Sequence, residues 1–283
     1  MTEIFSGRID IVADGQTFAE GPSMDAAGYL YFSDTRAGKL LRVNDDGVTR
    51  LFAELEGPNG TAFHWNGDIY VADPGGERVA RVTPGGGIYT VATTCDGEPF
   101  EGTPNDITFH PSGAIYFTAP QDPVEDGHRG PVYRIDPTGE VTKVIEGLQY
   151  PNGVNVDADG SHLYVAESYA GEIKIGDIQP DGSITDLRTF ANVADDGVDI
   201  VNGADGMCFD AEGNLYAANF RAAKVLRVNP AGQIDLEIRV EGPMVTNCCF
   251  GGPDFDQLYI TEGTLGRVYR ADLGIKGLAL FGP

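Results

Sequence analysis

The sequence predicts an all-β protein: a six-bladed β-propeller whose blades each contain four antiparallel strands and whose ring is closed by the N-terminal strand. Three observations predict this fold. A phrase of strand-forming residues recurs six times, strand-like segments flank each copy, and one further strand-like segment stands alone near the N-terminus. A β-sandwich is the rival fold, but sandwiches do not repeat a four-strand unit six times. We expect a single domain over residues 1–283, because all-β domains often reach this size.

The recurring phrase centres on a tyrosine and is rich in Tyr, Ile, Val and Phe, which favour strands. Successive tyrosines lie 39 to 52 residues apart, close to the length of one propeller blade. The six copies occupy residues 28–34, 67–73, 113–119, 161–167, 213–219 and 256–262. We therefore expect one strand of each blade in each copy.

Further strands are predicted on both sides of each copy. A short strand precedes it and ends in a turn such as DAAG (25–28). An alternating segment such as KLLRV (39–43) follows it, which is typical of a half-buried antiparallel strand. A less regular fourth strand, such as VTRLFAE (48–54), completes five of the units. The sixth unit lacks this last strand, and the N-terminal segment GRIDIVA (7–13) is predicted to supply it.

The charge of the chain argues against several classes of partner. The 283 residues include 19 basic and 43 acidic side chains, a net charge of −24, which repels phosphate backbones and anionic lipid. No apolar run could span a membrane, and the N-terminal residues do not read as a secretory signal. The four cysteines lack metal-site or disulfide-framework spacing and suit a reducing compartment. We expect a cytoplasmic monomer or dimer that binds neither nucleic acid nor membrane.

A ring of polar residues is predicted to face the central channel. The innermost strands of a propeller line this channel and all begin at the same end, so equivalent residues of the blades meet there. The residues 11 or 12 positions before the six tyrosines are Glu20, Asn59, Asn105, Asn152, Asp205 and Asn247. Asn and Asp before Gly are ordinary turn residues, but six oxygen-bearing side chains in register favour a metal site.

The ring is chemically suited to one divalent metal ion. Carboxylates and amide oxygens bind hard cations, and the ring contains no thiolate or imidazole for a structural zinc site. Oxygen ligands do not distinguish Ca²⁺, Mg²⁺, Mn²⁺, Zn²⁺ and Fe²⁺, although we favour Ca²⁺ or Zn²⁺.

Several segments resemble a known family. They are AEGP (19–22), PND (104–106), YPNG (150–153), GADGM (203–207) and TNCCFGG (246–252). In order, spacing and blade position they are similar to the gluconolactonase/senescence marker protein (regucalcin) family of six-bladed β-propeller lactonases. The resemblance covers about residues 15–271. It implies the same fold and a single divalent metal ion at the mouth of the channel.

The resemblance also implies roles for individual residues. Glu20, Asn152 and Asp205 correspond to the metal ligands, and Asp205 to the catalytic residue. Asn105 corresponds to a substrate contact or a fourth ligand. The mammalian sugar lactonases carry an arginine two residues before that asparagine, whereas this chain has Thr103, so contact with the lactone oxygens must come from elsewhere.

The predicted function is that of a metal-dependent hydrolase that opens a lactone ring, in the first place a sugar (aldono-) lactone. In this mechanism the metal polarises the carbonyl and stabilises the oxyanion, while Asp205 accepts the proton of the attacking water. Asp205 could instead act as the nucleophile, as proposed for related phosphotriesterases. Two alternatives stay open. One is a phosphotriesterase-like or non-sugar lactone hydrolase on the same site, and the other is a non-catalytic calcium-binding or protein-binding propeller.

Substrate contacts are expected on the face that carries the ring. If the innermost strands run away from the ring, the turns after the second strands lie on this face, as do the connections between blades. Two long connections, 93–104 and 119–131, could act as a lid. The candidate substrate contacts are Asn59, Thr103, His128 and Arg221. Further residues on this face are Arg36, Glu98, Phe100, Arg129, Tyr150, Tyr169 and Phe220.

Overall fold

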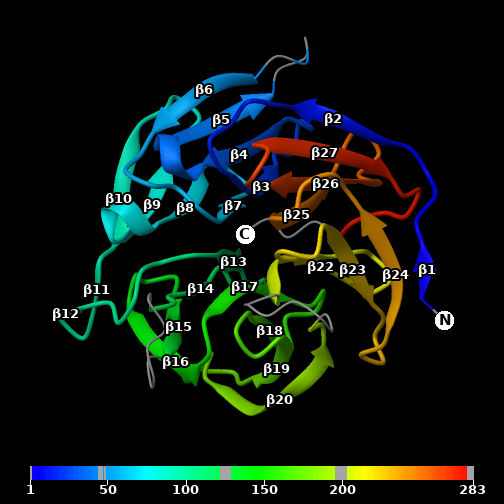
Figure 1. Ribbon diagram of the computed structural model, residues 1–283. Coiled ribbons are helices and arrows are strands. Elements are labelled where there is room, and N and C mark those ends of the chain that lie inside the picture. The colour runs from blue at the N-terminus through cyan, green and yellow to red at the C-terminus, as the bar shows by residue number, and fades with distance from the viewer. Residues whose placement is uncertain (1, 44–46, 48, 122–128, 195–202, 279–283) are drawn as a thin grey trace.

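The computed structural model describes residues 2–43, 47, 49–121, 129–194 and 203–278. It is a ring of six antiparallel sheets around a central channel, which confirms the predicted β-propeller (Figure 1). Each sheet contains four strands in sequence order from the channel outwards, apart from the closing strand of the sixth blade and one added strand on the fifth. His128, a predicted substrate contact, lies outside the described residues.

The first three blades follow one another along the chain. Blade one contains β3 (Ala19–Met24), β4 (Leu30–Asp34), β5 (Lys39–Val43) and β6 (Thr49–Glu54). Blade two contains β7 (Thr61–Phe63), β8 (Ile69–Asp73), β9 (Arg78–Val82) and β10 (Ile88–Ala92). Blade three contains β13 (Ile107–Phe109), β14 (Ile115–Thr118), β15 (Gly130–Ile135) and β16 (Val141–Leu148).

The last three blades repeat the pattern. Blade four contains β17 (Pro151–Val156), β18 (His162–Glu167), β19 (Glu172–Ile178) and β20 (Ile184–Asn192). Blade five contains β21 (Ala204–Phe209), β22 (Leu215–Asn219), β23 (Lys224–Val228) and β24 (Ile234–Arg239). Blade six contains β25 (Val245–Gly251), β26 (Gln257–Glu262) and β27 (Arg267–Asp272).

The N-terminal segment completes the ring as predicted. Strand β2 (Ile9–Ala13) pairs antiparallel with β27, and Ile9 lies opposite Ala271, so this strand is the outermost of blade six. Figure 1 shows β2 running along the outside of β27. Before it, β1 (Glu3–Ile4) adds to blade five in parallel with β24. The first 13 residues therefore join two neighbouring blades.

The hydrophobic core is divided among the contacts between neighbouring blades. Six buried clusters among the described residues each combine side chains from two adjacent blades. The recurring tyrosines explain part of this packing, because four of them contact a phenylalanine at or near the end of the next innermost strand. These edge-on pairs are Tyr31–Phe63, Tyr70–Phe109, Tyr164–Phe209 and Tyr216–Phe250, with ring centroids 5.0 to 5.1 Å apart. The repeated phrase thus supplies an aromatic blade-to-blade contact in four of the six units.

Two short helices and one extra hairpin depart from the strand pattern. The 3₁₀ helices η1 (Thr35–Ala37) and η2 (Pro74–Gly76) form the turns after β4 and β8. Strands β11 (Thr94–Cys95) and β12 (Glu98–Pro99) form a hairpin in the connection to blade three. No helix among the described residues combines the length and hydropathy that a bilayer crossing requires.

Candidate metal and substrate site

The predicted ring residues lie where the chain enters the blades. Glu20, Asn152 and Asp205 are the second residues of β3, β17 and β21. Asn59 and Asn105 come two residues before β7 and β13. Because all the innermost strands begin at the same end of the channel, these five side chains from five blades share one location.

Buried carboxylates fix the backbone that leads to these residues. In four blades the last residue of the second strand accepts an N–H from the connection that enters the same blade. The bonds join Phe18 to Asp34 (3.0 Å), Gly57 to Asp73 (2.9 Å), Gln149 to Glu167 (2.6 Å) and Met244 to Glu262 (3.0 Å). Hydrogen bonds to charged groups are stronger than neutral ones, so these acids hold the start of each innermost strand in place.

Close approach of neighbouring blades requires glycine directly after the ring residue. A Cβ atom on Gly21 would clash with the backbone of Asn59, and one on Gly153 would clash with the backbone of Asp205. Gly206 faces the side chain of Asn247 in the same way. Glycine is therefore needed after the ring residue in AEG, PNG and ADG, because a side chain there would push the neighbouring innermost strands apart.

These residues surround a cavity of about 250 Å³, which we call the site cavity. Its lining consists of Phe18, Glu20, Asn59, Asn105, Tyr150, Asn152, Ser168, Tyr169, Asp205, Phe220 and Arg221. Five of the six predicted ring residues belong to it, together with Arg221 among the predicted substrate contacts. Sequence reasoning also placed Tyr150, Tyr169 and Phe220 on this face, but it missed Phe18 and Ser168.

Asn247, the sixth ring residue, does not line the site cavity. Its Nδ2 donates to the Glu20 carboxylate at 3.2 Å, and its Oδ1 accepts from the Cys248 N–H at 2.8 Å. Both ends of the amide are therefore occupied by protein groups. Asn247 supports Glu20 and does not face the site cavity with the other five.

None of the described residues in the two long connections lines the site cavity. Thr103 is exposed and does not line the site cavity, and its N–H donates to the Pro120 carbonyl at 3.2 Å. Phe100 packs into the core, 5.1 Å from the Phe117 ring and 5.0 Å from the Tyr133 ring. Arg129 donates to the Gly147 carbonyl at 3.0 Å. The lid expectation stays a prediction, and residues 122–128 of the second connection lie outside the described residues.

Sequence reasoning missed Asp106, the residue after Asn105. In blades one, two, four and five this position is glycine, whereas blade three has a carboxylate that is only 7% exposed. Its oxygens accept from the Ile107 N–H at 3.0 Å and from the Val154 N–H at 3.3 Å. The departure of PND from the PNG pattern was the available signal.

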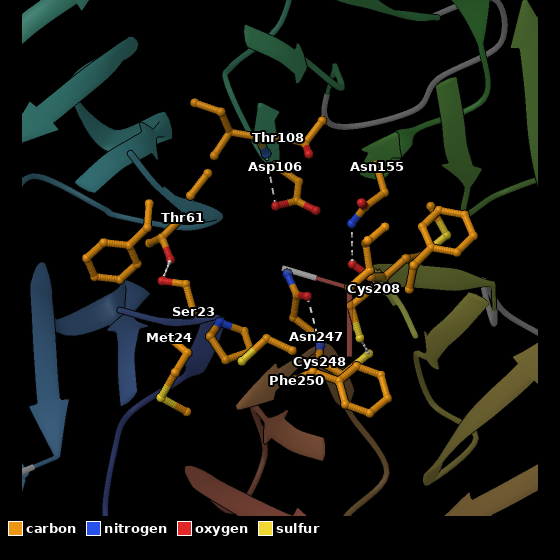
Figure 2. A pocket seen from close by; sticks show the side chains of 18 of the residues that line it. Ser23, Met24, Thr61, Asp106, Thr108, Asn155, Cys208, Asn247, Cys248 and Phe250 are labelled. Atoms are coloured by element: carbon orange, nitrogen blue, oxygen red, sulfur yellow. Dashed lines mark hydrogen bonds between the residues drawn. The ribbon is translucent and has the colours of Figure 1, made fainter. Parts of the chain in front are cut away.

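Asp106 projects into a second cavity, farther along the channel. This channel cavity has a volume of about 110 Å³. Figure 2 shows Asp106, Asn155 and Asn247 pointing into it from three blades, with Ser23 and Thr61 hydrogen-bonded to each other at 2.6 Å. The channel therefore stays polar below the site cavity.

Burial raises the pKa of three carboxyl groups, and neighbouring carboxylates add to this effect for two of them. Burial, with the charge of Asp106, raises the pKa of Glu20 to about 8. Burial raises the pKa of Asp106 to about 7. Burial and the charges of Glu20 and Asp106 raise the pKa of Asp205 well above its usual range, although a hydrogen bond from Asn152 opposes this. None of the main influences on these three groups is a positive charge from a described side chain, so they favour a bound cation.

The donor set fits one divalent ion only if amide oxygens take part. No three Asp, Glu, His or Cys side chains converge into a metal site within the described part of the chain. Glu20 and Asp205 supply two carboxylates, and the amides of Asn59, Asn105 and Asn152 line the same cavity. The buried Oδ1 of Asn59 has no hydrogen-bond partner among the described residues. An oxygen-rich site with one unsatisfied amide oxygen suits a hard cation.

Comparison with known proteins agrees with this arrangement. The family described as the SMP-30/Gluconolactonase/LRE-like region matches residues 18–264, which is most of the chain and all five lining ring residues. The chain belongs to this family. Its match begins at Phe18, at the edge of the site cavity, and ends two residues after Glu262.

Several known proteins are similar to this chain over most of its length. A gluconolactonase of Zymomonas mobilis is 27% identical over 87% of this chain and 76% of its own. A regucalcin of Xenopus laevis is 25% identical over 95% of both chains. The structure of a gluconolactonase from Xanthomonas campestris matches with a TM-score of 0.82 and 25% identity, over 96% of this chain and 91% of that one. A calcium-binding regucalcin from Agrobacterium tumefaciens shares the fold, with a TM-score of 0.85 at 21% identity over 100% of this chain and 99% of its own.

Proposed function

We propose that this protein is a metal-dependent lactonase that opens the ring of a sugar lactone of the aldonolactone type. The observation that carries the proposal is the pairing of Glu20 and Asp205 with amide oxygens in one buried cavity, in a chain whose relatives include gluconolactonases. The cavity is smaller than the pockets of about 300–1,000 Å³ that bury drug-sized ligands, which suits a single sugar ring.

Glu20, Asn152 and Asp205 would hold one divalent ion, with Asn105 as a fourth ligand or a substrate contact. The regucalcin relatives favour calcium in this role, since one of them is described as calcium-binding. When bound, such an ion supplies Lewis-acid polarisation of a carbonyl and a water of lowered pKa.

Asp205 is the residue we assign to proton transfer. The raised pKa of Asp205 favours its neutral form, and a neutral carboxyl cannot accept a proton. Asp205 becomes a carboxylate when positive charge lies beside it, because an opposite charge favours the ionised form. Its carboxylate oxygen then takes the proton of the attacking water, and Asn152 orients it through their hydrogen bond.

Aromatic side chains would position the sugar ring. Phe18, Tyr150, Tyr169 and Phe220 line the cavity, and the rings of Tyr150 and Tyr169 meet edge-on at 4.9 Å. Rigid apolar walls exclude water and leave few orientations for a small ring, which aligns the lactone carbonyl with Asp205.

The first test is hydrolysis of a series of sugar lactones by chelator-stripped protein, followed as proton release, with single metals added back. We expect one metal to restore turnover. Asp205→Asn should lower kcat by roughly 10²- to 10⁴-fold, the usual contribution of a general base. Asp181→Asn makes the same chemical change in an exposed turn and should leave kcat unchanged.

Each other outcome has a clear meaning. An active Asp205→Asn variant that still carries metal would overturn the assignment of Asp205. Tight binding of one metal by the wild type without turnover of any lactone would instead favour a non-catalytic calcium-binding propeller, as the name of the regucalcin relatives suggests.

A further inference from the structure

We propose that Arg221 binds a carboxylate of the substrate, so that the preferred lactone carries a second acid group, as the monolactone of a sugar dicarboxylic acid does. This inference rests on the lactonase function proposed above and narrows its substrate class. Arg221 is the one cationic side chain among the described residues that line the site cavity.

Among the described residues, the Nε of Arg221 is buried without a hydrogen-bond partner. The guanidinium contacts the neighbouring Phe220 ring, 5.8 Å from the centroid. Four arginine Nε atoms among the described residues are buried without a hydrogen-bond partner, and the one of Arg221 belongs to a residue that lines the site cavity, so a ligand in the cavity could supply its acceptor.

Arg221 is not the counter-ion of the metal-site acids. The positive charge of Arg221 is not among the main influences on the pKa of Glu20 or Asp205. Yet Arg221 and Asp205 belong to the same blade, because Ala204 lies opposite Asn219 and the Phe220 N–H donates to the Gly203 carbonyl at 3.1 Å. One molecule in the cavity could therefore meet Asp205 at one end and the guanidinium at the other.

The backbone at Arg221 differs from that of the equivalent turns. The turns after the second strands read TRAG (35–38), PGGE (74–77), SYAG (168–171), FRAA (220–223) and GTLG (263–266). Arg221 is the second residue of its turn and has a left-handed φ of 67°, whereas the equivalent Arg36, Tyr169 and Thr264 do not have a positive φ. A left-handed arginine is disfavoured, and strain of this kind clusters at ligand-binding positions.

A carboxylate is the acceptor that fits best. The planar guanidinium donates through a fixed fork that matches two carboxylate oxygens, and such charge-assisted bonds are about twice as strong as neutral ones. A hydroxyl group would satisfy only one donor. The net charge of −24 repels anions in general, so any preference for an anionic lactone must come from a local group such as Arg221.

The test compares a carboxylate-bearing aldaric acid monolactone with a neutral aldonolactone of the same ring size. We expect the wild type to prefer the anionic lactone. Arg221→Gln should lower kcat/KM for that lactone by roughly 10- to 100-fold, the loss expected for a charge-assisted bond, and change the neutral lactone by less than about threefold. Arg239→Gln removes the same charge from an exposed position of blade five and should change neither.

A binding measurement separates this proposal from the lactonase proposal. Calorimetry with the ring-opened dicarboxylate and the matching monocarboxylate needs no turnover. Tighter binding of the dicarboxylate by the wild type, lost in Arg221→Gln, would support the carboxylate site even if no lactone were hydrolysed. Equal binding of the two acids, or an equal loss of kcat/KM for both lactones in Arg221→Gln, would overturn it, whether or not lactonase activity is present.

Discussion

At the scale of single residues, Asp106 has a large effect on the electrostatics of the site. It occupies a position that is glycine in four other blades, and its carboxyl is buried between the site cavity and the channel cavity. Its charge raises the pKa of both Glu20 and Asp205. Without a bound cation, no strong positive charge from a described side chain offsets the three buried carboxyl groups. Their raised pKa values therefore favour the protonated forms.

Replacing Asp106 by Asn should stabilise the metal-free protein at alkaline pH. With a folded pKa of about 7 against about 3.9 in the unfolded chain, ionising Asp106 at pH 8 costs up to ~4 kcal/mol of folding free energy. The neutral amide removes this cost. We expect Asp106→Asn to raise the free energy of unfolding by about 1–4 kcal/mol at pH 8, measured by urea denaturation with a chelator present.

The same variant provides its own control at acid pH. At pH 5 the folded wild type still carries the proton on Asp106 and only the unfolded chain is ionised, so the gain should fall to roughly a third of its value at pH 8. An equal gain in the free energy of unfolding at pH 5 and pH 8 would show that packing, and not ionisation, causes the difference in stability between Asp106 and its Asn replacement.

Individual site residues differed in how far the sequence could identify them. Glu20, Asn59, Asn105, Asn152 and Asp205 were predicted because one register positions them all. Asn247 obeys the same register, but its amide is hydrogen-bonded to Glu20, which no spacing indicates. The left-handed φ of Arg221 likewise depends on its turn in three dimensions, and an Arg in sequence gives no sign of it.

At the scale of elements, the glycine that follows a ring residue couples one blade to the next. The innermost strands approach so closely that a methyl group on Gly153 would meet the Asp205 carbonyl. Blade four thus sets the position of the catalytic candidate in blade five. Stability and activity share this contact, and a change there should affect both.

Gly153→Ala tests this coupling. Overpacking typically costs about 1–3 kcal/mol, and here the obstructing atom belongs to backbone, so we expect a loss of at least this size in the free energy of unfolding. Lactonase activity should fall as Asp205 shifts. Gly85→Ala is the matched control, because no atom lies within 4 Å of the added methyl group. A Gly153→Ala variant as stable and active as Gly85→Ala would contradict the coupling.

The repeat made the strands predictable, whereas segments that depart from the repeat were harder to predict. Second and third strands were clear from alternation, and β2 was assigned to blade six because that unit lacked its fourth strand. The connection to blade three has no counterpart in the other units. Phe100 was therefore expected near the substrate, although its ring packs against those of Phe117 and Tyr133 in the core. Tertiary contacts decided its role.

At the scale of the whole molecule, the excess of acid has two parts. Most acidic side chains in the described part of the chain are at least partly exposed and contribute to the net charge of −24, while Glu20, Asp106 and Asp205 are buried without strong pairing to a described cation. The exposed charges affect solubility and association. The buried ones link the stability of the fold to pH and to metal ions.

Stability of the metal-free protein should fall as pH rises. Glu20 and Asp106 have folded pKa values of about 8 and about 7, above their unfolded values near 4, so the folded state binds more protons across this range. The stabilising contribution is complete below about pH 4 and is lost as pH rises through 7 and 8. We expect Tm to decrease from pH 5.5 to 8.5 in chelator, and much less with saturating Ca²⁺, measured by differential scanning calorimetry.

Binding of the cation should release protons, because Glu20 and Asp205 must ionise to act as ligands. Calorimetric titrations in two buffers of different ionisation enthalpy would detect this release. A Tm that is independent of pH in chelator, together with no proton release on adding Ca²⁺, would contradict the buried acid cluster as the cation site.

The pairing of β2 with β27 also has a consequence during protein synthesis. Ile9 lies opposite Ala271, so the first strand of the ring to leave the ribosome waits for a partner made 262 residues later. At about 5–20 residues per second this interval is roughly 13–50 s. During that time β2 is an unpaired hydrophobic edge and blade six cannot form, which is the period of greatest risk of mispairing with another chain. The ring therefore closes last, with the earliest and the latest residues of the chain in one sheet.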